Sequence, residues 1–358
     1  MKLVFDEDLS VAESIYNDVE RTHKGLGSLI LFNLLGTLAR KATFVIGVSG
    51  SGKSRACDAL ELVLNGKTTV IRKDEITKAA LVKLQSQLTN FYGLVIVDDL
   101  GNIDTDYMLE QTTHVFVQLC YSHSIVKHTY TYDLIIDNFN GAVIMNVQPI
   151  IFRKVMGRNS WNASYRDKCL RFYHLHRPVE PVQCLPRFQV PDEVFEVHLE
   201  DVEFRRQDLD RQLLERTMEN FLWQYSEGRA IEHFLDLSRA IAMLNCRKKV
   251  LDSDVNLLWQ LTRNWKLESY ATRTNQLEGI RKLDNDFIAI ITEIATYKEP
   301  YFDEVMRRYG YRRSTFYSII NRLREYVFVK RDSPARIVPT QLTLSVLRDI
   351  GELDEGDD

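Results

Sequence analysis

The 358-residue sequence lacks the features that mark several large classes of protein. Its five cysteines are odd in number, scattered and without a Cys-x-x-Cys pair, which argues against a disulfide framework and against a zinc site. The N-terminus, MKLVFDEDLS, lacks the basic and apolar regions of a signal peptide. The longest apolar stretch, residues 26–39, is interrupted by polar residues and is too short to cross a bilayer, so it predicts a core helix. These absences predict a cytoplasmic protein with no membrane partner.

A large excess of charge is also missing. The 46 basic and 50 acidic residues leave a net charge of −4, so the chain as a whole has no electrostatic attraction for nucleic acid. Any basic surface must therefore be local. The length and the 45% of apolar residues predict two or three packed units rather than one.

The distribution of apolar segments predicts an α/β fold. Over residues 1–175, β-rich runs alternate with helical segments, the pattern of a mostly parallel sheet with helices on both faces. The expected strands are residues 43–48, 68–72, 94–97, 142–147 and 169–175. Four of the eight prolines, at positions 178, 181, 186 and 191, fall in or near a predicted linker, residues 176–205.

The remainder of the chain is predicted to be mainly helical. Residues 206–268 form a helical unit, with one amphipathic helix whose apolar face runs from Ile231 to Ala242 and another that is N-capped by Asp252. A C-terminal unit follows over residues 283–350. Residues 351–358, which are rich in acids, are expected to form a frayed tail.

The run GVSGSGKS, residues 47–54, follows a β-rich stretch and precedes a helical one, the context in which it predicts a phosphate-binding loop. The glycines let backbone N–H groups wrap the phosphates, and the next helix presents its positive end. Lys53 would reach the β- and γ-phosphates, and the Ser54 hydroxyl would ligate Mg²⁺. The alternative is a glycine-rich turn without a ligand. The residues predicted to bind ATP are Gly47, Ser49, Gly50, Ser51, Gly52, Lys53, Ser54 and Arg55.

Three polar residues follow apolar strands and complete the predicted site. Residues 94–97 form an apolar run that ends in Asp98 and Asp99. Asp98 is predicted to ligate the metal, and Asp99 to polarise the attacking water. Two surface carboxylates in a turn are the alternative. Asn146 ends the strand GAVIMNV, where a neutral amide can orient the water or touch the γ-phosphate.

The order of these elements, followed by Arg166 before a β-rich segment and then a helical lid, resembles an AAA+ ATPase over about residues 25–265. The lid sequence RAIEHFLDLSRAIAMLNCRKKVLDSDV is most similar to that of the minichromosome-maintenance (MCM) helicases. The resemblance implies that Arg229, which opens this lid segment, is a sensor-2 arginine that touches the nucleotide. It also implies a homo-oligomer, expected to be a hexameric ring.

Two further segments are similar to MCM helicases. The stretch SIVKHTYTYDLIIDNF, residues 124–139, lies where that family inserts a β-hairpin that carries a basic residue towards DNA, which here would be Lys127 or His128. The segment NASYRDKCLRFYHL is similar to the arginine-finger region, so Arg166 would contact the γ-phosphate bound by a neighbouring subunit, with Arg158 and Arg171 as competing candidates. Asp99 departs from the usual glutamate, and regulatory STAND-type ATPases also end this strand in two aspartates.

The C-terminal unit reads as three helices followed by two short strands and resembles a winged helix. Between Tyr301 and Arg336, nine basic residues stand against four acidic ones, a local excess that fits contact with DNA phosphates. A solvated basic face, or a winged helix that binds protein, is the alternative. The predicted DNA-binding residues are Arg312, Arg313, Thr315, Tyr317 and Arg322 on the helix and Lys330, Arg331 and Arg336 on the wing.

These observations lead to a first hypothesis of an AAA+ motor that acts on DNA, with catalytic residues Lys53, Asp98, Asp99, Asn146, Arg166 and Arg229. The second hypothesis is a STAND-like nucleotide-gated regulator with slow hydrolysis. A third is a protein-remodelling ATPase with no role on DNA.

Overall fold

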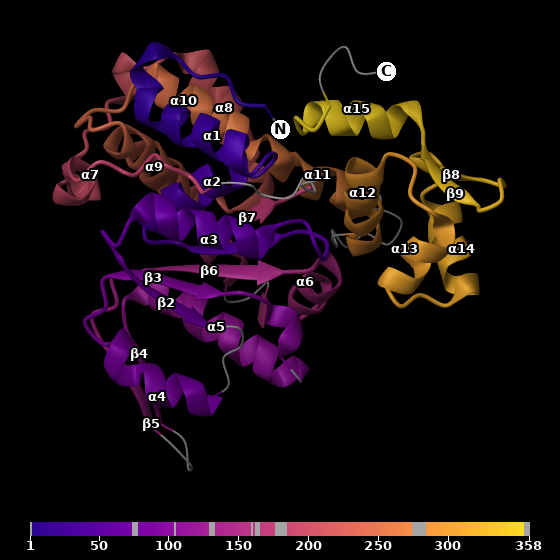
Figure 1. The fold of residues 1–358 in the computed structure, drawn as a ribbon, viewed down its shortest axis with the longest axis horizontal. Helices are drawn as coiled ribbons and strands as arrows, with labels where there is room; N and C mark the ends of the chain where they lie inside the picture. The colour runs from indigo at the N-terminus through magenta and orange to yellow at the C-terminus, as the bar shows by residue number, and fades with distance from the viewer. Residues whose placement is uncertain are drawn as a thin grey trace.

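The computed structural model describes residues 2–73, 78–103, 105–128, 133–158, 160–161, 165–175, 185–273 and 284–353. Figure 1 shows a layered body that contains the chain from the N-terminus through residue 273 and a smaller C-terminal unit beside it. Among the described residues, no helix is both long and apolar enough to traverse a bilayer.

Five parallel strands form the central sheet, in the order β2-β3-β6-β1-β7. Strands β1, β3, β6 and β7 are buried along their whole length, as expected for a parallel sheet that helices cover on both faces. The α/β class and the five predicted strands are confirmed, with ends that shift by at most two residues. The strands are β1 (Ala42–Ile46), β2 (Thr69–Lys73), β3 (Gly93–Val97), β6 (Ala142–Val147) and β7 (Cys169–Tyr173).

Helices cover both faces of the sheet, and successive side chains of each strand enter different cores. Phe44 and Ile46 of β1 pack with α4 (Lys78–Leu88), α5 (Asp106–Ser122) and α6 (Pro149–Met156). Val45 faces the other way, towards α2 (Gly27–Leu38) and α3 (Lys53–Leu64). All twelve residues of α2 are buried, which confirms the predicted core helix at residues 26–39.

A layer of helices lies over α2 and includes both ends of the main body. It contains α8 (Arg211–Gln224), α9 (Glu227–Leu244), α10 (Asp252–Thr262) and α11 (Lys266–Arg273), as well as the N-terminal helix α1 (Ser10–Thr22). The side-chain oxygen of Asn245, at the end of α9, accepts hydrogen bonds from the backbone N–H groups of Val11 and Ala12, at 3.1 and 3.2 Å. The predicted helical unit therefore packs around the N-terminus as well as onto the core.

Two local predictions in this layer were wrong. Asp252 is the first residue of α10 rather than its cap, and its carboxylate accepts a hydrogen bond from the backbone N–H of Asp210 at 2.8 Å. Ile231, the first residue of the predicted apolar face of α9, is 45% exposed, whereas the predicted face is otherwise confirmed by the buried Phe234, Ser238, Ile241 and Ala242.

The described part of the predicted linker, residues 185–205, packs against the main body. Val190, Val194 and Val202 are buried, and the N–H of Val190 donates to the carbonyl of Val63 at 2.9 Å. A short helix, α7 (Glu193–Glu196), lies in this segment. Residues 176–184, with two of the four prolines, are outside the described part of the chain.

The chain forms a two-stranded antiparallel hairpin, β4 (Ile125–His128) and β5 (Asp133–Ile136), after α5 and before β6. The hairpin projects away from the sheet (Figure 1). A hairpin at this position agrees with the sequence expectation. Residues 129–132, at its tip, lie outside the described residues.

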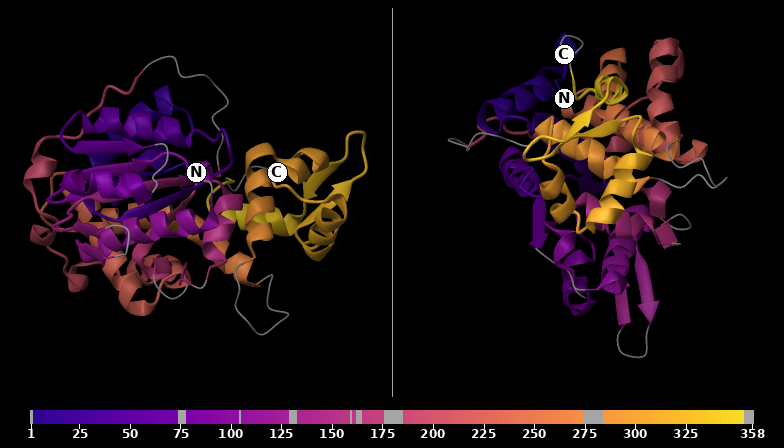
Figure 2. Two further views of the ribbon diagram at one scale, coloured as in Figure 1. Left: turned by 90° about the horizontal axis from the view of Figure 1, so that it is seen from below. Right: turned by 90° about the vertical axis from the view of Figure 1, so that its right-hand side faces the viewer.

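The C-terminal unit lies at one end of the molecule (Figure 2). Its element order matches the predicted one, and Gly310 follows the second helix with a φ of 66°. A further helix returns to the main body, where Arg263 Nη2 donates to the carbonyl oxygen of Arg348 at 2.7 Å. Residues 354–358 of the predicted acidic tail are not described. The elements are α12 (Asn285–Tyr297), α13 (Phe302–Arg308), α14 (Arg313–Arg322), β8 (Val327–Lys330), β9 (Arg336–Pro339) and α15 (Gln341–Asp349).

Candidate functional site

The glycine-rich loop lies at the carboxyl end of β1 and leads directly into α3. Gly50 and Gly52 adopt φ angles of 74° and 90°, which side-chain-bearing residues rarely adopt. A methyl group on Gly47 would lie 2.9 Å from the carbonyl oxygen of His174. The loop therefore requires these three glycines to curl back over the start of α3, where free backbone N–H groups can bind an anion.

Lys53 is the first residue of α3, and its side chain lies inside the loop. Its ammonium group donates to the carbonyl oxygens of Gly47 at 2.7 Å and Val48 at 3.0 Å. Burial lowers the pKa of Lys53 to about 8, while the nearby Asp99 carboxylate acts to raise it. A buried ammonium group without a full ion pair is a strong site for an anion.

Sequence reasoning missed His174, which supports the loop from the end of β7. Its ring Nε2 lies 2.8 Å from the carbonyl oxygen of Ser51 and donates to it. The side chain is 3% exposed, so this buried hydrogen bond holds the backbone of Ser51 in the loop against the end of β7. Its place at the carboxyl end of a predicted strand was the available signal.

Asp98 directly follows β3 at the same edge of the sheet, but its carboxylate is paired with a basic residue that sequence reasoning also missed. Arg72 Nη2 donates to Asp98 Oδ1 at 3.0 Å, and Nε contacts Oδ2. The same guanidinium contacts Asp58 and Glu61 of α3. The hydrogen bond with Asp98 is the largest cause that raises the pKa of Arg72.

Asp99 and Asn146 lie on neighbouring strands of the same edge. Asp99 Oδ1 accepts a hydrogen bond from the N–H of Gly101 at 2.8 Å, and Gln148 Nε2 lies 3.5 Å from Oδ2. Asn146 is fully buried, and its Nδ2 donates to Cys57 Sγ of α3 at 3.3 Å. Because β6 lies between β1 and β3, Asn146 stands between the loop strand and the strand of the two aspartates.

The hydroxyl of Ser54 and the carboxylate of Asp98 are hard oxygen donors, which fit Mg²⁺. Within the described ranges, no group of three or more His, Cys, Asp or Glu side chains could hold a metal alone. Magnesium in sites of this kind keeps one or two protein ligands and takes the rest from phosphates and water. The chemistry of the donor set therefore fits a metal that arrives with a nucleotide.

The three candidate arginine fingers have different surroundings. Arg171 is fully buried in β7 and makes a two-point pair with Glu268, at 2.7 and 3.2 Å, so it cannot reach a neighbouring subunit. Arg158 pairs with Asp106 at 2.8 Å. Arg166 is partly exposed just before β7, and within the described residues its side chain has no ion-pair partner. Of the three, Arg166 is the one whose guanidinium is free, among the described residues, to contact a neighbouring subunit.

Arg229 is not brought to the loop. It contacts Glu232 and the hydroxyl of Tyr121, and its guanidinium carbon lies 4.4 Å from the centre of the Tyr121 ring. These residues line a pocket of about 280 Å³ with Lys41 and Lys168, which precede β1 and β7. The pocket is thus at the amino ends of the strands, opposite the loop. Arg229 therefore lies away from the loop of its own chain, and its contact with a nucleotide stays a prediction.

The predicted DNA-binding residues of the C-terminal unit differ in whether their side chains are paired with acidic residues. Arg312, Arg313 and Thr315 are exposed at the start of α14, and Tyr317 is 44% exposed. Arg331 is exposed as well. Lys330 is exposed too but pairs with Asp332 at 3.1 Å, and the partly exposed Arg336 pairs with Glu299 at 3.4 Å.

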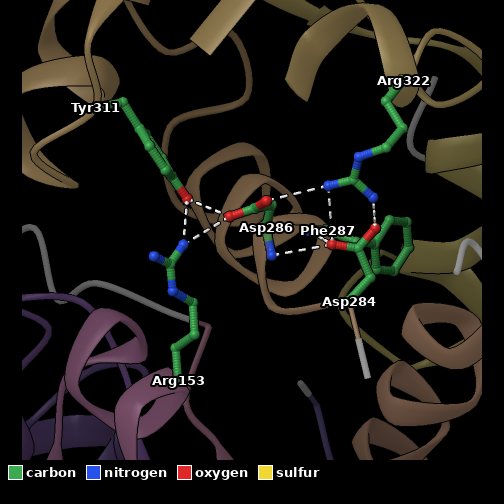
Figure 3. Close-up of polar contacts among 6 residues, drawn as sticks. All are labelled: Arg153, Asp284, Asp286, Phe287, Tyr311 and Arg322. Carbon is green, nitrogen blue, oxygen red and sulfur yellow. Dashed lines mark hydrogen bonds and ion pairs between the residues drawn. The ribbon is translucent and has the colours of Figure 1, made fainter. Parts of the chain in front are cut away.

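Arg322 belongs to a partly exposed network of polar contacts (Figure 3). Its guanidinium binds Asp284 and Asp286, with Nη2 3.1 Å from Asp286 Oδ2. Arg153 of α6 and the Tyr311 hydroxyl converge on the other oxygen of Asp286, at 2.8 and 2.5 Å. Arg322 therefore joins α14 to the start of α12 within the C-terminal unit, and Arg153 joins the same Asp286 to the core. These partners favour a structural role for Arg322, and its contact with DNA stays a prediction.

On the hairpin, His128 Nδ1 lies 2.9 Å from the carboxylate of Asp133, and both side chains are exposed. The backbone of Lys127 pairs with Leu134, and its side chain lies outside the described part of the structure.

No protein-family model matches the chain, and no curated protein matches it at a significant level.

Proposed function

We propose that the chain is an ATPase of the AAA+ type that binds ATP with Mg²⁺ at residues 47–54 and acts on DNA. The observation that carries the proposal is the placement of Lys53. Its ammonium group is buried in a loop that needs glycine, beside two aspartates at the carboxyl edge of a parallel sheet, where ligands of such sheets bind.

The proposed chemistry uses this chain's residues in separate roles. Lys53 and the loop N–H groups bind the phosphates, Ser54 and Asp98 hold Mg²⁺, and Asp99 accepts a proton from the attacking water. Bound Mg²⁺ would neutralise charge on the phosphates. Asn146 orients the water from the strand between them.

A neighbouring copy of the chain would supply Arg166, because that guanidinium is available and lies away from its own loop. The rate of hydrolysis per molecule should then rise with protein concentration. Mixing Lys53→Ala protein, which keeps Arg166, with Arg166→Ala protein, which keeps the loop, should restore activity that neither variant has alone. No recovery in the mixture would contradict a shared site.

The nucleotide assignment is tested by calorimetric titration of ATP and ADP. Lys53→Ala should abolish binding, whereas the exposed control Lys248→Ala should bind as the wild type does. Equal binding by Lys53→Ala would overturn the assignment. A reducing cytoplasmic location is part of the proposal, in keeping with the scattered cysteines.

The DNA assignment depends on α14 and the strands after it, which we propose form a winged helix. Arg312, Arg313 and Arg331 supply exposed positive charge there. DNA should stimulate hydrolysis, and its affinity should fall steeply with salt. An affinity that does not change with salt would remove DNA as the partner.

A STAND-like regulator remains the second candidate because one observation favours it. The carboxylate of Asp98 is already held by Arg72, an arrangement that suits binding without rapid turnover. Tight nucleotide binding with no hydrolysis, with or without DNA, would support this candidate over a motor.

A further inference from the structure

The guanidinium of Arg72 lies between the two residues expected to hold the metal. Its Nη2 is 3.0 Å from Asp98 Oδ1 and 3.5 Å from the backbone oxygen of Ser54. Because Nε contacts Asp98 Oδ2 as well, both oxygens of the carboxylate are engaged. The side chains are 29% and 13% exposed, so water screens this pair only in part.

Arg72 also has partners that do not belong to the metal site. Its Nη1 contacts Asp58 and lies 3.2 Å from Glu61 Oε1, both on the outer side of α3. These two carboxylates can keep the guanidinium paired when it leaves Asp98. Arg72 thus has a second position available without becoming an unpaired charge.

We infer that Arg72 is a positioning residue of the metal site, which holds Asp98 in the nucleotide-free protein and releases it when Mg²⁺ enters with the nucleotide. Mg²⁺ requires oxygen ligands at about 2.0–2.1 Å in near-octahedral geometry. A guanidinium that covers both oxygens of Asp98 prevents that geometry. Metal and arginine therefore compete for one carboxylate, and the inference rests on the proposed nucleotide site.

The competition makes a specific prediction about metal affinity. In the protein saturated with ADP, Arg72→Gln should bind Mn²⁺, as a spectroscopic substitute for Mg²⁺, about tenfold more tightly than the wild type. Arg72→Lys should fall between the two because an ammonium group cannot cover both oxygens. The affinity for ADP in the presence of EDTA should not change.

Two variants separate this effect from a general change of charge. Lys73→Gln removes the same charge from the next, exposed residue of β2 and should leave Mn²⁺ affinity unchanged. In Arg72→Gln with Asp98→Asn, the gain should disappear, because the freed carboxylate is its source.

The experiment titrates Mn²⁺ into the 358-residue chain with ADP and follows free Mn²⁺ by electron paramagnetic resonance, after thermal unfolding has shown that each variant is folded. If Arg72→Gln does not fold, Arg72→Lys carries the test. Unchanged or weaker Mn²⁺ affinity in the Arg72 variants, or an equal gain in Lys73→Gln, overturns the inference. Loss of ADP affinity in EDTA overturns it too, since Arg72 would then bind phosphate. Failure of the wild type to bind ADP would overturn the proposed function itself, and this inference with it.

Discussion

Removal of the Glu268 carboxylate should destabilise the contact between the sheet and the helical layer more than most single substitutions do. Glu268 Oε1 accepts hydrogen bonds from Arg171 Nε and the Tyr173 hydroxyl, each at 2.7 Å, and from Gln224 Nε2 at 3.2 Å. Glu268 is 3% exposed and Arg171 is fully buried. Glu268→Ala would leave donor groups on three buried side chains without their acceptor.

The size of the effect follows from the chemistry of the two partners. Breaking a buried ion pair costs about 3–5 kcal/mol, and a guanidinium cannot escape the cost by losing its proton. We therefore expect Glu268→Ala to lower the free energy of unfolding by about 4–5 kcal/mol, a large part of the total for a typical protein. In Arg171→Met with Glu268→Met, both charges are gone and apolar volume is kept, so most of the loss should be recovered.

Urea titration followed by tryptophan fluorescence measures these differences. Arg166→Ala is the matched control, because that side chain is partly exposed and unpaired among the described residues, and it should change stability by less than about 0.5 kcal/mol. A loss below about 1 kcal/mol for Glu268→Ala, or a double variant as unstable as the two single losses added together, would refute the reasoning.

Three further predictions concern the loop and the C-terminal unit. Nucleotide affinity should fall as the pH rises above about 8, because neutral Lys53 must then take up a proton to bind phosphate. Between pH 8 and 10.5, Lys53 is neutral in the folded protein but still protonated in the unfolded chain, so the nucleotide-free wild type should gain stability relative to Lys53→Met as the pH rises. Calorimetry in buffers of different ionisation heat measures the proton uptake, and its absence at pH 8.5 would contradict the prediction. Gly47→Ala should weaken nucleotide binding at least tenfold, as a methyl group would lie 2.9 Å from a backbone oxygen, whereas Gly228→Ala, with nothing within 4 Å, should not. Arg313→Gln should lower DNA affinity and reduce the slope of log affinity against log salt concentration by about 0.9, without loss of stability. Arg322→Gln should instead destabilise the protein by about 1–3 kcal/mol. Fluorescence anisotropy measures the DNA affinity and thermal unfolding the stability, and the reverse pattern would be evidence against both roles.

The strands were predictable because they are buried on both faces. Continuous apolar runs such as residues 94–97 mark such strands directly, and the polar residues that follow them must then lie at one edge. The loop was predictable for a related reason, since its glycines and Lys53 are consecutive in the sequence.

Pairing between distant residues was not predictable. A basic pattern in the C-terminal unit does not distinguish exposed Arg313 from Arg322, whose acidic partner Asp284 lies 38 positions away. Arg171 meets Glu268 across 97 positions. Arg72 could be connected with Asp98 only after the order of strands in the sheet was known.

The N-terminal helices depend on partners from the far end of the main body, and this determines the order in which the protein can fold during synthesis. Val4 exchanges hydrogen bonds with the side chain of Gln260, 256 residues later, and the fully buried α2 is covered by α9. At about 5–20 residues per second, the ribosome needs on the order of 10–50 s to produce that partner. Throughout this interval α2, the most apolar of these helices, is not yet packed against α9, so chaperones can bind it and it can aggregate with other chains.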